Sequence, residues 1–232
     1  MKKQLILLFT SLLILSSCTT SKPVMRSEAY GTLYEETPLA IMVLPPINKS
    51  VNVEAKELFY SSLTLPLTQY GYYVLPSILT MDILKEESAY DTELYKTNSM
   101  KKVGEYFGAD AVLITTIHEW NKTSLLNKIK VKVEYELRST KTDDVLFHRT
   151  GDILLSSASN TGSILGNVIA NMISTALTKE VSVGESCNWY TLCDIPYGKY
   201  SPRHLQDGEI LTGPKEFSIT VNSTGNFKGI YK

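Results

Sequence analysis

The chain has 232 residues, of which 43% are hydrophobic and 20% charged, and its formal net charge at pH 7 is −1. This composition is typical of a globular protein that buries a core, and the length suits one domain with terminal extensions. The charge balance excludes a strongly basic nucleic-acid-binding protein, so we expect no nucleic-acid partner. After residue 18, no apolar stretch of the sequence is long enough to span a bilayer.

The first eighteen residues have the pattern of an export signal. Lys2 and Lys3 precede an apolar run at 5–15, and the sequence Leu-Ser-Ser-Cys ends at Cys18. A positive start, a short apolar region and small residues are typical of a secretory signal, and the run is well short of the roughly 20 residues of a transmembrane anchor. Leu-Ser-Ser-Cys resembles the bacterial lipobox, in which the cysteine is acylated and becomes the first residue. We therefore predict a lipoprotein signal peptide at 1–17 and a lipid, such as palmitate, on Cys18.

The residue after this cysteine indicates the membrane. Thr19 follows Cys18, whereas the usual sorting rule requires an aspartate there to retain a lipoprotein in the inner membrane. We therefore expect an outer-membrane anchor, with the folded domain facing the periplasm. Each buried acyl CH₂ contributes about 0.8 kcal/mol, so two or more acyl chains attach a protein durably.

Two further cysteines, Cys187 and Cys193, form a candidate pair. An exported protein meets an oxidising compartment, which favours a disulfide that closes the small loop 188–192. Free buried thiols are the alternative. A zinc site would need two more ligands, and the three histidines show no ligand spacing, so we expect neither a metal nor a cofactor.

Composition divides the mature chain into three parts. Residues 18–37 are polar and lack an apolar period, which predicts a lipid-attached linker. Residues 38–181 contain the apolar runs and predict an α/β domain. Residues 182–232 are rich in Tyr, Gly, Pro and Asn and predict a C-terminal tail that holds the possible disulfide loop.

The first half of the domain alternates between strands and helices. Continuous apolar runs predict buried strands at 39–44, 72–75 and 109–117. The spacing of apolar residues predicts a helix from about 53 to 70 kinked at Pro66, helices at 78–87 and 99–107, and a surface connection at 90–97. This β-α-β-α-α-β order favours a parallel sheet covered by helices.

The second half has the pattern of a half-exposed hairpin. Apolar residues alternate with Lys, Glu and Arg at 128–138, a turn follows, and a partner strand is predicted at 145–155. An uncharged amphipathic helix is expected at 164–177, packed on the sheet or lying at an interface or membrane surface. A last strand is expected at 216–221. The predicted fold class is α/β, with a three-layer-like mixed sheet of a parallel part and an antiparallel hairpin, flanked by helices and followed by an irregular tail.

No catalytic motif is complete. Gly-Glu-Ser-Cys at 184–187 lacks the second glycine of a nucleophile elbow, and prolines follow the first strand, where a phosphate-binding loop needs amide donors. Polar residues do follow two of the predicted parallel strands, at the edge where such sheets bind ligands. These candidate binding residues are Asn48, Lys49, Ser50, His118, Glu119 and Trp120. The competing interpretation is a strand end with a packed Trp120 and a solvent-facing His118.

Several stretches together resemble a family of lipoproteins of Gram-negative bacteria that has no assigned activity. The resemblance covers roughly residues 38–181 behind the lipobox, and Pro-Tyr-Gly at 196–198 also matches. It is carried by Met-Val-Leu-Pro-Pro-Ile-Asn-Lys-Ser at 42–50, Leu-Pro-Leu at 65–67, Gly-Tyr-Tyr-Val-Leu-Pro at 71–76 and Phe-Gly-Ala-Asp-Ala-Val-Leu at 107–113. The family resembles in fold the α/β domains of CsgG-type secretion lipoproteins and the N-terminal domain of TolB.

This resemblance implies a non-enzymatic role at the outer membrane and assembly into oligomers or with other envelope lipoproteins. It supplies no catalytic residue. We therefore predict a binding or assembly module, an accessory subunit of a cell-envelope secretion or assembly complex. A periplasmic protein that binds a small ligand or peptidoglycan is the alternative, and a hydrolase that uses His118 and Glu119 is the third hypothesis.

Overall fold

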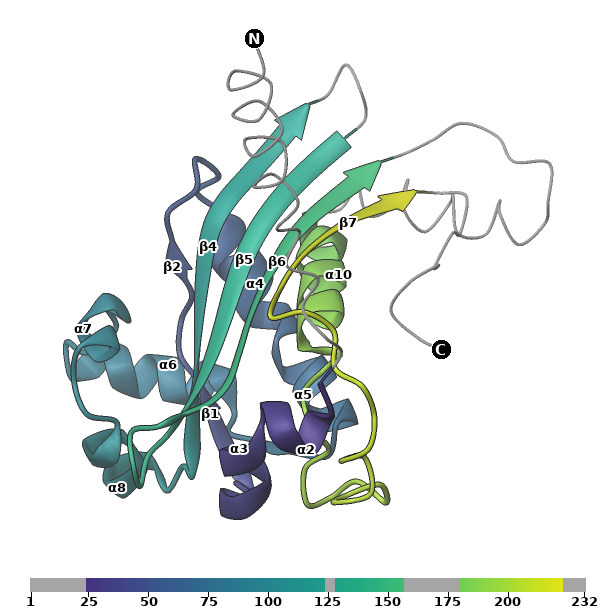
Figure 1. Cartoon of the computed structure of the whole chain (residues 1–232). Helices are drawn as coiled ribbons and strands as arrows, with labels where there is room; N and C mark the ends of the chain where they lie inside the picture. The colour runs from purple at the N-terminus through teal and green to yellow at the C-terminus, as the bar shows by residue number, and fades with distance from the viewer. Residues whose placement is uncertain (1–23, 124–127, 157–179, 223–232) are drawn as a thin grey trace, which may run out of the picture.

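The computed structural model describes residues 24–123, 128–156 and 180–222, which form a mixed sheet flanked by helices (Figure 1). The strands are β1 (Ala40–Val43), β2 (Ile47–Asn48), β3 (Tyr73–Val74), β4 (Ala111–Thr123), β5 (Lys128–Ser139), β6 (Val145–Ser156) and β7 (Glu216–Asn222). The helices are α2 (Arg26–Ala29), α3 (Gly31–Glu36), α4 (Ala55–Ser62), α5 (Thr64–Gln69), α6 (Ser77–Glu86), α7 (Glu93–Lys96), α8 (Lys101–Phe107) and α10 (Glu180–Leu192). Over these residues, no helix is both long and apolar enough to cross a membrane.

The sheet has seven strands in the order β3-β1-β4-β5-β6-β7, and β2 also pairs with β4. β1 lies between β3 and β4 and is parallel to both. β4, β5 and β6 form an antiparallel meander, and β7 returns parallel to β6. A parallel part joined to an antiparallel hairpin and flanked by helices confirms the predicted α/β fold class.

Helices cover both faces of the sheet around β1. On one face, Phe59 of α4 and Val183 of α10 belong to a core cluster with Ile41. On the other face, Leu84 of α6 belongs to a second cluster with Met42. β1 is therefore buried on both sides, which explains its unbroken apolar sequence. Burying each such side chain contributes roughly 1.5–3 kcal/mol relative to leaving it exposed.

β5 is buried on one face only. Its buried apolar residues alternate with charged residues that are half-buried or exposed, as the sequence predicts. The apolar set belongs to the same cluster as α4 and α10. Among the described residues, the cluster beneath α6 and α8 includes nothing from β5. The charged face of β5 is therefore a partly open surface of the sheet.

The segment between β1 and β3 differs from its prediction. The sequence predicts one helix kinked at Pro66, whereas the structure has two, with α4 ending at Ser62 and α5 beginning at Thr64. Pro66 lies in the first turn of α5, where backbone amides have no intrahelical acceptor, so its missing N–H does little harm. Gly71 follows α5 with φ +87°, a conformation that favours glycine. The predicted surface connection at 90–97 contains the short helix α7.

The folded domain begins earlier than residue 38. Helices α2 and α3 occupy most of 26–36, inside the segment for which the sequence predicts a linker over 18–37. Tyr30 and Leu33 are buried in the core, and the Tyr30 ring lies 5.0 Å from the Phe147 ring of β6 between centroids. The polar residues around these two apolar side chains mask them in the sequence pattern.

The predicted tail at 182–232 also contains parts of the fold. Helix α10 packs on α4 and on the sheet, and its Val183 and Cys187 are buried in the core. β7 confirms the strand expected at 216–221. The amphipathic helix expected at 164–177 lies outside the described residues.

Cys187 and Cys193 do not form the predicted disulfide. Both thiols are free and buried. Burial raises the pKa of the Cys187 thiol, which stays protonated. The Cys193 thiol donates to the Tyr190 carbonyl at 3.0 Å. A buried cysteine can remain unpaired because it packs like a small apolar side chain.

Candidate functional site

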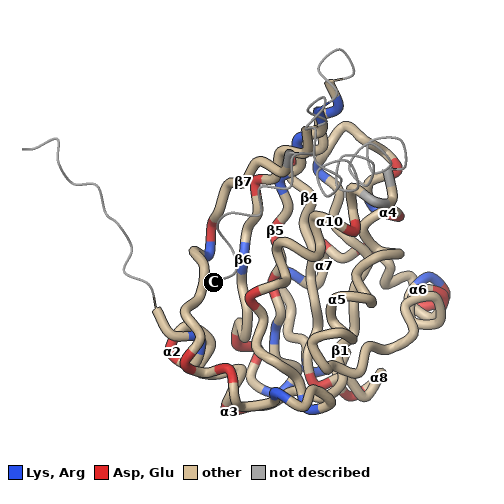
Figure 2. The backbone as a smooth tube through the Cα atoms, turned by 90° about the vertical axis from the view of Figure 1, so that its right-hand side faces the viewer, with Lys and Arg blue, Asp and Glu red and all other residues tan. Residues whose placement is uncertain are grey.

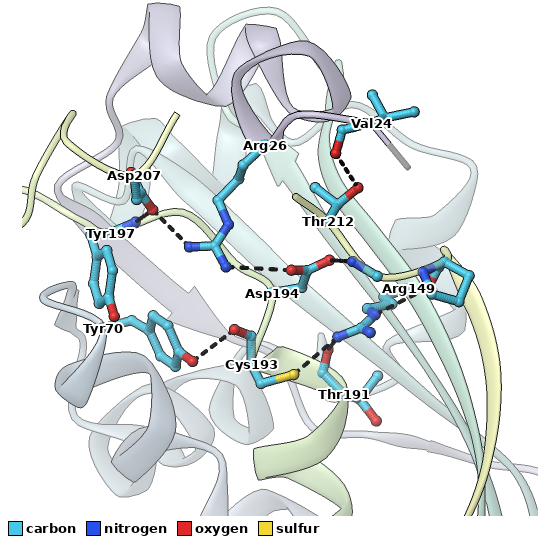
Figure 3. A network of polar contacts seen from close by, with 12 residues as sticks. Val24, Arg26, Tyr70, Arg149, Thr191, Cys193, Asp194, Tyr197, Asp207 and Thr212 are labelled. Carbon is cyan, nitrogen blue, oxygen red and sulfur yellow. Dashed lines mark hydrogen bonds and ion pairs between the residues drawn. The ribbon is translucent and has the colours of Figure 1, made fainter. Parts of the chain in front are cut away.

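A buried polar network attaches the N-terminal segment to the C-terminal part of the chain (Figure 3). Arg26 Nη1 donates to Asp207 Oδ2 at 2.9 Å, and Arg26 Nη2 donates to Asp194 Oδ1 at 3.4 Å. All three side chains are less than a tenth exposed. Burial alone would lower the pKa of Arg26, but the hydrogen bond to Asp207 and the charge of Asp194 outweigh it and raise the pKa. The guanidinium is therefore charged in the folded protein.

The two carboxylates have further donors. Asp207 accepts hydrogen bonds from the Tyr197 backbone amide at 3.0 Å and from the Tyr34 hydroxyl at 2.9 Å. Asp194 accepts one from the Gly213 backbone amide at 2.9 Å. These donors satisfy the oxygens of both buried carboxylates, whereas Arg26 Nε has no hydrogen-bond partner among the described residues. The network thus joins α2 and α3 to the loop that precedes β7.

A second buried arginine, Arg149 of β6, lies beside this network (Figure 3). Its guanidinium donates to the carbonyls of Tyr190 and Thr191 at 3.4 and 3.3 Å and to Cys193 Sγ at 3.2 Å. It also lies 4.5 Å from the centroid of the Phe217 ring. The last carbonyls of a helix favour a cation, so Arg149 stabilises the end of α10. It connects β6, α10 and β7.

Backbone pairing continues the attachment toward the N-terminus. Met25 and Leu211 form an isolated antiparallel bridge. A backbone hydrogen bond of 2.8 Å flanks it on each side, one to the Val24 carbonyl and one from the Arg26 amide. Val24 is six positions after Cys18 in the sequence. The chain is therefore fixed to the domain shortly after the predicted lipid.

The predicted binding residues at 48–50 and 118–120 lie on adjacent stretches of backbone, but their side chains do not meet. β2 pairs with β4, and the Lys49 amide donates to the Ile117 carbonyl at 2.8 Å. Asn48 Oδ1 accepts from the Ser50 amide at 3.0 Å, and Asn48 Nδ2 donates to the Asn52 carbonyl at 2.7 Å. Asn48 and Ser50 thus stabilise their own loop.

The residues at the other strand end point in different directions. Trp120 is 2% exposed and packs edge-on against Phe59, with 5.7 Å between ring centroids. Glu119 is paired with Lys130 at 3.1 Å on the partly open surface. His118 contacts neither of them and faces the adjacent strand. The six predicted binding residues therefore do not line one common cavity in the described structure.

His118 instead joins a cluster across three antiparallel strands. Glu134 contacts His118 Nε2 at 2.8 Å through one carboxylate oxygen and His148 Nε2 at 2.9 Å through the other. Burial alone would raise the pKa of Glu134, but the hydrogen bonds with the two histidines lower it to about 2. Ligand atoms of Glu134, Glu136 and His148 lie within 4.8 Å of one another. Because Arg138 already pairs with Glu136 at 3.4 Å, we interpret the cluster as a surface network without a metal.

An apolar groove of about 510 Å³ lies between α4 and α6, beyond the carboxyl ends of β1 and β3. The connection after β1 runs through α4 on one face of the sheet, and the connection after β3 runs through α6 on the other. Such a switch point is where open α/β sheets bind ligands. Its walls include Pro45, Tyr60, Pro76, Ile78, Met81 and Tyr90. No local pattern in the sequence predicts this groove.

Hydrogen bonds within the protein hold the polar groups in the lining of the groove. The Tyr60 hydroxyl donates to the Ser77 carbonyl at 2.8 Å, and the Thr64 and Ser77 hydroxyls contact each other at 3.2 Å. Burial raises the pKa of Tyr60, which therefore remains a donor. Lys56 Nζ lies 3.9 Å above the Tyr90 ring centroid at the mouth. The described lining also includes the hydroxyl of Ser61 and the charged side chain of Glu57.

These features define a class of protein: a mixed α/β domain whose N-terminal segment is part of its fold. The chain belongs to the family described as "Putative lipoprotein GNA1162-like", whose model matches residues 28–215. The matched span extends beyond the predicted domain 38–181 on both sides and includes α3 and α10.

The chain is also similar to one further sequence and to several solved structures. A protein of Neisseria meningitidis serogroup B, described as "Putative lipoprotein NMB1124/NMB1162", is 27% identical over 181 residues, which are 76% of this chain and 83% of the relative. The crystal structure of lipoprotein GNA1162 from Neisseria meningitidis is similar with 24% identity and a TM-score of 0.49, covering 63% of this chain and 99% of that one. The PelC dodecamer from Paraburkholderia phytofirmans is similar with 14% identity and a TM-score of 0.43, covering 68% and 88%.

Proposed function

We propose that this chain is a lipid-anchored, non-enzymatic binding and assembly module of the outer membrane, with its domain in the periplasm. The lipid is carried by Cys18. The observation that supports the proposal is that the chain from Val24 onward is part of the domain, held by the buried ion pairs of Arg26 and by backbone pairing. A lipid on Cys18 would then determine the position of the domain as well as its compartment.

The length of the tether limits this position. An extended chain spans at most about 3.6 Å per residue, so the six residue steps from Cys18 to Val24 reach at most about 22 Å. A linker over the whole of 18–37 would reach about 68 Å on the same basis. The early start of the fold therefore keeps the domain close to the membrane surface.

The groove between α4 and α6 is the proposed docking site. Ile78 on its wall is 74% exposed. Exposed apolar residues beside a concave apolar surface are typical of interaction sites. The partner is another envelope lipoprotein of a secretion or assembly complex, or a second copy of this chain. The same proposal includes a relationship in fold to CsgG-type secretion lipoproteins and to the N-terminal domain of TolB.

Membrane fractionation tests the anchor. Cys18→Ala should release the domain from the outer membrane without unfolding it, since Cys18 precedes every described contact of the fold. The control is the thermal melting curve of the released protein, which should match that of the wild-type domain. A Cys18→Ala protein that still fractionates with the outer membrane contradicts the anchor.

Photo-crosslinking tests the docking groove. A photo-reactive residue at Ile78 should capture one specific envelope protein or a second copy. The matched control is the same residue at Tyr106 of α8, which is 64% exposed and does not line the groove. Equal products from both positions would contradict docking at the groove.

A periplasmic ligand-binding protein is the second candidate, and the volume of the groove favours it. About 510 Å³ lies within the range of small-molecule pockets, roughly 300–1,000 Å³. Native mass spectrometry of protein isolated from the envelope should then show a bound small molecule or peptidoglycan fragment that Met81→Lys abolishes. The third candidate, a hydrolase, requires His118 and Glu119, so unchanged function in His118→Ala and Glu119→Ala would dismiss it.

A further inference from the structure

We propose that Met25 and Leu211 form a membrane-contacting patch that seats the domain on the lipid bilayer. The inference rests on the proposed lipidation of Cys18 and goes beyond it, because it identifies the face of the domain that touches lipid. The patch lies where the chain enters the domain from the anchor.

Met25 and Leu211 are neighbours on the surface. The residues that flank Met25 and Leu211 make the two backbone hydrogen bonds, so Met25 and Leu211 are a non-hydrogen-bonded antiparallel pair. In such a pair the side chains lie close together on the same side of the two strands. Arg26, the next residue, points inward to Asp194 and Asp207, whereas half of the Met25 side chain is exposed. Met25 and Leu211 are 50% and 57% exposed.

The tether selects lipid as the occupant of this patch. The Val24 carbonyl accepts a hydrogen bond from the Thr212 amide at 2.8 Å, directly beside the patch. The lipid-bearing Cys18 is therefore at most about 22 Å of extended chain away, whatever conformation the tether adopts. Apolar side chains held this close to a bilayer can bury their surface at the boundary between headgroups and acyl chains. Isolated exposed apolar residues need no explanation, but this pair flanks the point of attachment.

Ile78 of α6 is a matched comparison. It is also apolar and is 74% exposed. Figure 2 places α2, next to which the patch lies, and α6 on opposite sides of the molecule. A domain seated on the patch should therefore keep Ile78 in water.

The test uses the full lipidated chain in vesicles of phosphatidylethanolamine and phosphatidylglycerol. An environment-sensitive NBD fluorophore is attached to Leu211→Cys or, as the control, to Ile78→Cys. Cys187 and Cys193 are buried and should not react in the folded protein. We expect the label at position 211 to shift to shorter emission wavelength and to be quenched by brominated lipids, whereas the label at position 78 does neither.

Three outcomes would overturn the inference for different reasons. If the protein floats with the vesicles and neither label is quenched, the anchor holds and the seating is wrong. If the label at 211 shifts in wavelength without quenching by brominated lipid, protein covers the patch and lipid is not its occupant. If the protein does not float, the proposed anchoring fails, and the seating fails with it.

Discussion

Replacing Arg26 by alanine should destabilise the domain by several kcal/mol. Arg26 contacts both Asp194 and Asp207, and no other ion pair to these carboxylates is found among the described residues. Removing it leaves two buried carboxylates without their cation. Breaking a buried ion pair in this way typically costs about 3–5 kcal/mol, because the remaining charge is poorly solvated.

Urea and thermal unfolding of the unlipidated Cys18→Ala chain measure this loss. In a domain of this size each kcal/mol lowers Tm by about 2–4 °C, so Arg26→Ala should lower it by roughly 6–20 °C. The matched control is Arg203→Ala. Arg203 donates to the Tyr197 hydroxyl at 3.0 Å on the surface, so its removal should change stability by about 0.5 kcal/mol or less.

A loss of stability below about 1 kcal/mol in Arg26→Ala would refute the argument that both carboxylates depend on Arg26.

Three further predictions concern the surface cluster, one turn and the cysteines. Glu134 has a folded-state pKa of about 2, below its ordinary 4.5, so its contribution to stability is present above pH 4.5 and is lost as the pH falls toward 2. Urea unfolding of Glu134→Gln should show a flatter pH profile over this window, and parallel profiles would contradict the assignment. Gly71→Ala should destabilise the domain by about 1 kcal/mol or more, because Gly71 has positive φ and an added Cβ would meet the backbone of Ser201. Gly31→Ala is the control, since its Cβ would meet no atom within 4 Å, and thermal melting should show no loss. A reducing agent should leave Tm unchanged because both described cysteines are free thiols, whereas a lower Tm on reduction would reveal a disulfide.

The sheet could be predicted because its signals are local. The continuous apolar run around Met42 and the strict alternation along 128–138 each depend on neighbours within one strand. Burial on two faces and on one face leave these different patterns in the sequence. Six of the seven described strands follow from such patterns, whereas the two-residue strand β2 (Ile47–Asn48) leaves no such pattern.

The buried arginines could not be predicted in the same way. Arg26 lies in a polar stretch, and its partners Asp194 and Asp207 are 168 and 181 positions away. A charged residue is buried only when partners neutralise it, and no local pattern shows which distant residues those are. The sequence therefore predicts the N-terminal linker and the C-terminal tail as separate, irregular segments. In the structure, Arg26 of the first segment pairs with Asp194 and Asp207 of the second.

At the candidate site, the sequence predicts which strand ends are neighbours but not which side chains meet. The strand end at His118 and the loop at Asn48 do lie side by side, as parallel strand order requires. The partners of their side chains depend on register, because Glu134 reaches both His118 and His148 across adjacent strands. The groove depends on how α4 and α6 lie on opposite sides of one sheet edge, which only the assembled fold determines.

The attachment and the groove together constrain how an anchored binding module of this kind would work. Arg26 and Arg149 join the N-terminal segment to β6, β7 and the end of α10, and α10 packs on α4, which forms one wall of the groove. Each step in this path is a contact within the described fold. A lipid at Cys18 would thus set the height of the domain through a short tether, and its orientation through the patch beside α2. Since α6 lies on the side opposite α2 in Figure 2, the same attachment would turn the groove away from the membrane, where a periplasmic partner can reach it.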